Sequence, residues 1–267
     1  MTDEVFLIPA RPTATAGLLA EAAARRGMTV RALGPDFREL AGRPVHWCGG
    51  PHAAARVAGA LGLGLLEPPD DWLTRLPERF TGRRIELTTL GRAARELIGS
   101  GRPAFVKPPR EKSFPPAVYG PGTPLPRSLP AATAVLVSEV VDFAAEYRLF
   151  LLDGEIATGS RYSVHGRLDP APLDEDARGA DVRGFAAALL AETGPDLPSA
   201  VTVDVGLVAA TGRYAVVEAN MPWFSNSYAA RPEAALDVVL RAAGPLDRVG
   251  PSDLPFVTPE GVSRLSR

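Results

Sequence analysis

A chain of 267 residues is longer than one average domain, so one large domain or two packed units are expected. Apolar residues make up 46% and charged residues 22% of the sequence, and the formal net charge is -2, which excludes the basic excess of a nucleic-acid binder and an acidic tail. The single cysteine, Cys48, excludes an internal disulfide framework, and no apolar run reaches the ~20 residues that span a bilayer, so we expect a cytoplasmic protein without a nucleic-acid or membrane partner.

Short apolar runs alternate with helical patterns over the first 67 residues. Strands are predicted at 5–9, 28–33, 44–48 and 61–66, with helices at 13–26 and 51–60 between them. Strands that alternate with helices are typical of a parallel α/β unit. The Pro- and Asp-rich stretch 67–79 then predicts a connection to a second domain.

The next segment contains both lysines of the chain, Lys107 and Lys112, in the stretch FVKPPREKSF, whereas arginine occurs 27 times. A strand at 84–88, a helix at 90–98 and a strand at 103–107 precede the pair, and a Pro-rich loop or flap at 115–130 follows it. Lysine presents a compact point charge that can follow a phosphate oxygen, where guanidinium prefers a fixed two-pronged geometry. Because Lys107 stands at a strand end, where ligand contacts gather, the pair predicts phosphate binding. The alternative is that both lysines are compositional survivors on a solvated loop.

The remainder of the chain has the pattern of a second set of strands. Strands are predicted at 135–141, 147–152, 155–162, 200–208 and 214–218, and helices at 181–193 and 232–243. An Asp153-Gly154 turn joins two of these strands as a β-hairpin, and the Pro- and Asp-rich stretch 165–180 is predicted to be a loop.

Three side chains with oxygen ligands occupy the last two predicted strands. Asp204 is the one acid in the apolar run 200–208, and Glu218 and Asn220 lie two positions apart, so they share a face. If the strands pair as a hairpin, the three side chains form a set of hard oxygen ligands that suits Mg²⁺. The alternative is that backbone amides satisfy Asp204 and that Glu218 and Asn220 only end a strand. An unpaired carboxylate in an apolar strand is costly, so a cation or an arginine is expected beside Asp204.

Together these stretches resemble the ATP-grasp superfamily, as seen in D-alanine–D-alanine ligases. FVKPPREKSF resembles its phosphate-contacting strand and loop, SEVVDFAAEYRLFLLDG its hinge strand, and DVGL with VVEANMPWFSNS its metal-binding hairpin. The similarity covers about residues 83–243, and the order and spacing of the motifs are more specific than any one of them. Within the superfamily the chain is most similar to the clade of predicted amide ligases marked by one arginine and two lysines, here Arg148, Lys107 and Lys112.

The resemblance implies an ATP-grasp fold of the α/β and α+β classes, in which two α+β subdomains clamp ATP with Mg²⁺. It implies a small Rossmann-like N-terminal domain at 1–80, a lid subdomain at 81–136 and a C-terminal subdomain with the metal site at 137–267. The implied enzyme is an ADP-forming ligase that converts a small-molecule or peptide carboxylate into an acyl phosphate and joins it to an amine. An ATP-grasp phosphotransferase and a non-catalytic ATP-binding protein are the alternatives.

The resemblance also implies roles for individual residues. The set that binds the nucleotide is Lys107, Lys112, Glu139, Val140, Glu146 and Arg84. The catalytic set is Arg148, Arg161 and Lys112. The metal ligands are Asp204, Glu218 and Asn220. The acceptor pocket is lined by Trp223, Ser225, Asn226 and Ser227.

Simpler roles are open for several of these residues. Glu146 and Arg148 would be a cross-strand ion pair, Arg161 a solvated charge at a strand end, and 221–228 a packed loop under the sheet. The chain also departs from the family pattern, because Thr202 stands where D-alanine ligases carry an arginine for the acyl phosphate. The lysine that opens the nucleotide domain in relatives is replaced here by Arg83 or Arg84.

Overall fold

The computed structural model describes residues 3–109 and 114–258, and the predicted site residue Lys112 lies outside them. Contacts divide the chain into two units, of which the first comprises Met1–Pro69, Ala145–Val205 and Glu218–Arg267, and the second comprises Asp70–Ala144 and Gly206–Val217. The three-domain division with boundaries at 80 and 136 stays a prediction.

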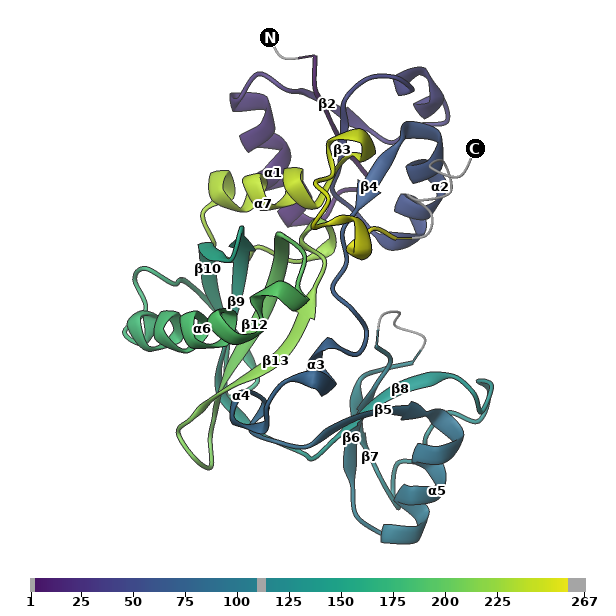
Figure 1. Ribbon diagram of the computed structural model, residues 1–267, viewed down its shortest axis with the longest axis vertical. Coiled ribbons are helices and arrows are strands. Elements are labelled where there is room, and N and C mark those ends of the chain that lie inside the picture. Colours follow the sequence, from purple (N-terminus) through teal and green to yellow (C-terminus); the bar gives the residue numbers. More distant parts are fainter. Residues whose placement is uncertain (1–2, 110–113, 259–267) are drawn as a thin grey trace. The chain divides into compact units, whose positions relative to one another are not determined.

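A three-stranded parallel sheet opens the first unit (Figure 1). The strands run in the order β2-β1-β3, with β1 at Val5–Ile8, β2 at Thr29–Ala32 and β3 at Val45–Trp47. Helix α1 (Ala14–Arg25) follows β1, and α2 (Pro51–Leu61) follows β3. Every residue of β1 is buried, as expected of a central parallel strand covered on both faces. The predicted parallel α/β unit is confirmed for these strands.

The fourth strand of this region has a different partner from the one predicted. β4 (Leu63–Leu65) pairs antiparallel with β14 (Ala243–Pro245), so the prediction that 61–66 extends the parallel unit is wrong. Such a short apolar run contains no signal for its partner, and the partner comes from the far end of the chain. Helix α7 (Pro232–Ala242) precedes β14 and buries Leu236, Val238 and Val239 in the same core as β1 and α1.

His46 on β3 is a buried titratable group in this core. Its Nδ1 lies 3.0 Å from the carbonyl oxygen of Leu240, so Nδ1 carries the proton of the neutral ring. Nε2 has no hydrogen-bond partner among the described residues. Burial therefore lowers the pKa of His46, against smaller opposing effects of the Leu240 carbonyl and Glu4.

Acid should destabilise the fold through His46. Because the pKa of His46 is lower in the folded than in the unfolded chain, the unfolded chain binds the proton first, and stability is lost as the pH falls below about 6.5. We expect His46→Gln to reduce the slope of unfolding free energy against pH between pH 7.5 and 5, by at most about 1.4 kcal/mol per pH unit. Urea denaturation across this range measures the slope. The exposed His52 provides the matched control, since His52→Gln should leave it unchanged; equal slopes in wild type and His46→Gln would contradict the prediction.

A five-stranded sheet forms the rest of the first unit, with the ends of three strands counted in the second. Its order is β11-β10-β9-β12-β13. The bounds are β9 Phe143–Leu152, β10 Glu155–Val164, β11 Arg167–Pro172, β12 Ala200–Val208 and β13 Tyr214–Asn220. Helix α6 (Gly179–Thr193) lies against β10 (Figure 1). The predicted hairpin of β9 and β10 is confirmed, with Asp153 and Gly154 both at positive φ in its turn.

The predicted loop at 165–180 is wrong in part, because residues 167–172 form β11. Pro170 and Pro172 argued against a strand, since proline cannot donate a ladder hydrogen bond. β11 is an edge strand, and its pairing with β10 shifts register between Arg161 and Ser163. Proline is tolerated at an edge and at a bulge.

A four-stranded antiparallel sheet with the order β5-β8-β6-β7 dominates the second unit. The strands are β5 Ile85–Thr89, β6 Ala104–Lys107, β7 Ala117–Tyr119 and β8 Ala134–Ser138. Helix α5 (Leu90–Ser100) packs Leu90 and Ala93 against Val106 and Val135 of this sheet (Figure 1). Two short helices, α3 (Trp72–Arg75) and α4 (Glu78–Thr81), precede it.

The remaining elements are single turns of 3-10 helix. They are η1 Phe37–Leu40, η2 Gly194–Asp196, η3 Pro222–Phe224, η4 Leu246–Arg248 and η5 Leu254–Phe256. No helix within the described residues is long and apolar enough to cross a bilayer.

Candidate functional site

A buried ion pair joins two neighbouring strands of the five-stranded sheet. Arg148 on β9 donates from Nε and Nη2 to the two carboxylate oxygens of Asp204 on β12, at 2.8 and 2.7 Å. The side chains are 11% and 2% exposed, so this is an interior pair with two-pronged geometry. The cation that the sequence demanded beside Asp204 is therefore an arginine. Backbone amides are not its partners, and Arg148 does not pair with Glu146.

The charges of this pair depend on each other. Burial raises the pKa of Asp204, and the charge and hydrogen bonds of Arg148 oppose the rise. Burial acts in the opposite sense on Arg148, but the charge of Asp204 outweighs it and the pKa of Arg148 is raised. Glu218 and Glu146 add negative potential, which further raises the pKa of Asp204. Without Arg148, this carboxylate would face two other acids in a dry interior.

Glu218 and Asn220 lie together at the end of β13, the other neighbour of β12. The amide Nδ2 of Asn220 donates to Oε1 of Glu218 at 2.8 Å, and the carbonyl oxygen of Asn220 accepts from Thr202 Oγ1 at 2.9 Å. Two carboxylates and an amide on adjacent strands fit a magnesium ion by donor type, since Mg²⁺ prefers oxygen ligands. Within residues 3–109 and 114–258, no three His, Cys, Asp or Glu side chains gather as a metal-binding group. The magnesium site thus depends on the amide of Asn220 and stays a prediction.

Two tyrosines that the sequence did not single out complete the surroundings of Arg148. Tyr162 on β10 donates its hydroxyl to Glu146 Oε2 at 2.9 Å. Its ring stacks on that of Tyr228, with centroids 5.0 Å apart and planes 14° apart. The Arg148 guanidinium carbon lies 5.7 Å from the Tyr162 centroid and 5.6 Å from that of Tyr228. Burial, with the charges of Asp204 and Glu146, raises the pKa of Tyr162, so its hydroxyl stays a donor.

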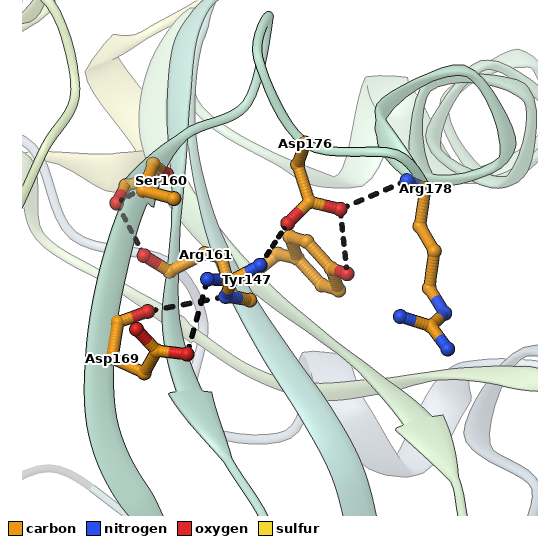
Figure 2. Close-up of polar contacts among 7 residues, drawn as sticks. Tyr147, Ser160, Arg161, Asp169, Asp176 and Arg178 are labelled. Atoms are coloured by element: carbon orange, nitrogen blue, oxygen red, sulfur yellow. Dashed lines mark hydrogen bonds and ion pairs between the residues drawn. The ribbon is translucent and has the colours of Figure 1, made fainter.

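Arg161 belongs to a separate polar network, shown in Figure 2. Its Nη1 donates to the buried carboxylate of Asp176 at 2.5 Å, and its Nε and Nη2 donate to the carbonyl and carboxylate of Asp169, both at 3.1 Å. Asp176 also accepts from the Tyr147 hydroxyl and from the backbone N–H of Arg178, just before α6. Arg161 therefore ties β10 to β11 and to the start of α6. This is not a solvated charge, and the catalytic role of Arg161 stays a prediction.

The predicted nucleotide residues in the second unit lie on and beside its sheet. Arg84 and Glu139 contact each other, with the backbone N–H of Arg84 donating to Glu139 Oε2 at 3.1 Å. Both line a cavity of about 720 Å³. Val140 follows Glu139 and is 44% exposed. Lys107 is half-buried at the last position of β6, as the strand-end prediction required.

The structure separates the two arginines proposed to replace the missing lysine. Arg83 is buried, and its guanidinium donates to the carbonyl oxygens of Thr81, Val216 and Val217. Arg84 is 81% exposed along its side chain. Arg83 thus fastens backbone, and Arg84 is the one with access to solvent.

Three of the four predicted acceptor-pocket residues are buried. Trp223 is part of the core and donates its indole N–H to the carbonyl oxygen of Leu66 at 3.0 Å. The hydroxyl of Ser225 lies 2.9 Å from Thr202 Oγ1, and the backbone N–H of Ser227 donates to Thr15 Oγ1 at 3.0 Å. Asn226 is exposed. Packing explains much of this segment, and its role in substrate binding stays a prediction.

A family model matches residues 80–238, more than half of the chain. It describes an ATP-grasp domain, family 2 of the clade named for one arginine and two lysines. The chain belongs to this family. The fold and the clade are those that the lysine stretch and the acidic hairpin predicted. No curated protein matches the chain.

Several solved ATP-grasp structures are similar over most of the chain. A RiPP-associated ATP-grasp ligase from Chryseobacterium gregarium, in complex with ADP and a leader and core peptide, has 11% identity and a TM-score of 0.50, covering 95% of this chain and 99% of that one. A RimK domain ATP-grasp protein from Sphaerobacter thermophilus has 18% identity and a TM-score of 0.46, covering 89% and 99%. The Microcystis aeruginosa macrocyclase MdnC, bound with precursor peptide MdnA, has 12% identity and a TM-score of 0.48, covering 89% and 99%. At these identities the likeness shows the fold alone.

Proposed function

We propose that this ATP-grasp protein is an ATP-dependent carboxylate–amine ligase. A carboxylate oxygen of the first substrate attacks the γ-phosphorus of ATP, the bond to the β–γ bridging oxygen breaks, and ADP leaves. The amine nitrogen of the second substrate then attacks the acyl carbon, the bond to the phosphate oxygen breaks, and phosphate leaves as the nitrogen loses its proton. Such transfer requires positioned charge around the phosphoryl oxygens more than covalent chemistry by the protein.

The observation that carries the proposal is the state of Arg148. Two of its nitrogens, Nε and Nη2, hold it on Asp204. Its third nitrogen, Nη1, makes no hydrogen bond among the residues that the structure describes. A fixed guanidinium with two N–H groups left over is suited to stabilise charge on a phosphoryl oxygen without reorganising during the reaction. In the proposal, Arg148 donates from Nη1 to the transferring group.

The other roles follow the family motifs. Lys107 would contact the α- and β-phosphates, Lys112 the β- or γ-phosphate, and Glu146 the ribose hydroxyls. Backbone groups of Glu139 and Val140 would pair with adenine. Asp204, Glu218 and Asn220 would hold magnesium, which when bound neutralises charge on the phosphate oxygens. Arg161 is proposed as a second cation near the phosphoryl group.

The class of substrate remains broad within this proposal. Its members are small-molecule or peptide carboxylates and amines. Peptides are included because the Chryseobacterium ligase is in complex with a leader and core peptide. The acceptor is proposed to meet the exposed part of 221–228, to which Asn226 belongs.

Hydroxylamine tests the reaction without knowledge of the natural amine. The full chain would be incubated with MgATP, hydroxylamine and mixtures of amino acids and short peptides, and hydroxamate and ADP would be measured. An acyl phosphate gives equal amounts of both, and only in the presence of the right carboxylate. A phosphorylated product that resists hydroxylamine would instead indicate a phosphotransferase. Glu218→Gln should abolish hydroxamate formation, whereas Glu233→Gln, at an exposed acid, should not.

A further inference from the structure

Tyr228 has a backbone conformation that side chains other than glycine rarely adopt. Three such residues occur in the described chain, at φ of 52° for Asp153, 47° for His165 and 50° for Tyr228. Asp153 and His165 each precede a glycine at positive φ in a two-residue hairpin turn, where this conformation is required. Tyr228 belongs to no such turn, because it lies between η3 and α7. An unexplained outlier of this kind is a reason to look for a function.

The backbone on both sides of Tyr228 is anchored to other elements. Ser227 donates its N–H to Thr15 Oγ1 at 3.0 Å, and Ala229 donates its N–H to Ser160 Oγ at 3.1 Å. Arg231 donates its N–H to Thr158 Oγ1 at 3.0 Å. These bonds hold the chain before and after Tyr228 on α1 and β10. The unusual φ is thus imposed by its surroundings rather than left to chance.

The consequence of this conformation is the position of the Tyr228 ring. The ring stacks on Tyr162 and lies 5.6 Å from the guanidinium carbon of Arg148. Tyr162 lies 5.7 Å from the same carbon and is itself held by Glu146. Aromatic faces attract guanidinium groups, and the attraction is stronger away from water. Arg148 is therefore restrained on one side by Asp204 and on another by a pair of stacked rings.

We propose that Tyr228, with Tyr162, is a positioning residue for Arg148. The pair keeps the guanidinium aimed while two of its nitrogens remain on Asp204, and this inference rests on the proposed role of Arg148 in phosphoryl transfer. The hydroxyl of Tyr228 has no hydrogen bond among the described residues. The ring is thus the part of Tyr228 that acts on Arg148, whereas Tyr162 acts through both its ring and its hydroxyl.

Substitution by glycine separates positioning from stability. Glycine adopts positive φ readily, so Tyr228→Gly removes the ring while relieving the backbone. Tyr228→Phe keeps the ring and is the conservative rescue. Phe37→Leu is the matched control, because Arg38 lies over the Phe37 ring at a similar 5.7 Å away from Asp204. Thermal unfolding of all variants establishes that each is folded.

The direct measurement is the Nε–Hε NMR signal of Arg148, identified by its loss in Arg148→Lys. We expect a sharp signal with slow solvent exchange in the wild type, Tyr228→Phe and Phe37→Leu, and exchange about tenfold faster in Tyr228→Gly. Formation of ADP from MgATP in the hydroxylamine assay should also fall about tenfold in Tyr228→Gly, while the Kd of a non-hydrolysable MgATP analogue changes less than about threefold. A wild-type Arg148 signal in Tyr228→Gly would overturn the inference.

The two proposals fail in different ways. If Arg148→Lys forms hydroxamate at the wild-type rate, the proposed role of Arg148 is wrong, whatever the tyrosines do. If Arg148→Lys is inactive but Tyr228→Gly matches the wild type in rate and in NMR signal, only the positioning role is wrong. Weaker binding of the analogue with an unchanged rate at saturation would also overturn positioning, since it would make Tyr228 a binding residue.

Discussion

Asp204→Asn should lower the free energy of unfolding by about 3–5 kcal/mol, because it leaves the buried charge of Arg148 without its counter-ion. The side chain of Asp204 is 2% exposed and accepts two hydrogen bonds from Arg148. The neutral amide keeps the size of the carboxylate, so the effect is electrostatic rather than a cavity. Urea denaturation of wild type and variant measures the difference.

An exposed ion pair gives the control for this experiment. Arg25 and Glu233 form a pair at 2.7 Å in which both side chains are more than half exposed. Glu233→Gln should leave stability almost unchanged, since such pairs contribute little in water. A loss in Asp204→Asn no larger than that in Glu233→Gln would contradict the importance of the buried pair.

A double substitution distinguishes the pair from its parts. Arg148→Met with Asp204→Leu removes both charges, and we expect it to be more stable than Asp204→Asn, because no unpaired charge remains inside. The double variant should nevertheless be inactive. Stability would then be recovered without function, which is the signature of an ion pair kept for chemistry.

Arg148→Lys should reduce the rate of phosphoryl transfer by about 10³-fold, the lower end of the effect of arginines that act on a transferring phosphoryl group. Lysine retains the positive charge but cannot hold both oxygens of Asp204 and still present a second nitrogen in a fixed direction. The Kd of a non-hydrolysable MgATP analogue should change far less than the rate, since the lost interaction belongs to the transition state. Rapid mixing with MgATP and the hydroxylamine assay measure the rate, and a titration with the analogue measures the Kd.

The same substitution at the surface controls for a general effect of losing an arginine. Arg25→Lys changes an exposed residue outside the site and should keep the wild-type rate. If Arg148→Lys retained a rate close to that of the wild type, a point charge would suffice. The fixed geometry on Asp204 would then have no catalytic purpose.

Much of the local structure follows from patterns within short windows. Apolar runs bounded by Gly and Pro located the strands that became β1, β9, β10 and β12, because period and turn chemistry are local properties. The family followed from the order of motifs along the chain, and the family match at 80–238 confirms it. Local patterns failed for β11, where prolines that suit an edge strand were taken for a loop.

The candidate site shows where local patterns end. The sequence by itself determined that Asp204, an acid in an apolar strand, needs a cation or an arginine, since an isolated buried charge is too costly. Only the tertiary structure decided that this cation is Arg148, 56 positions away, because strand order in a sheet brings β9 beside β12 and no short window encodes that order. The stacking of Tyr162 on Tyr228 was equally hidden, because it depends on an imposed φ at Tyr228 and on contacts from separate elements. Residue types and spacing thus determined which chemistry the chain requires, and packing decided which residues meet to supply it.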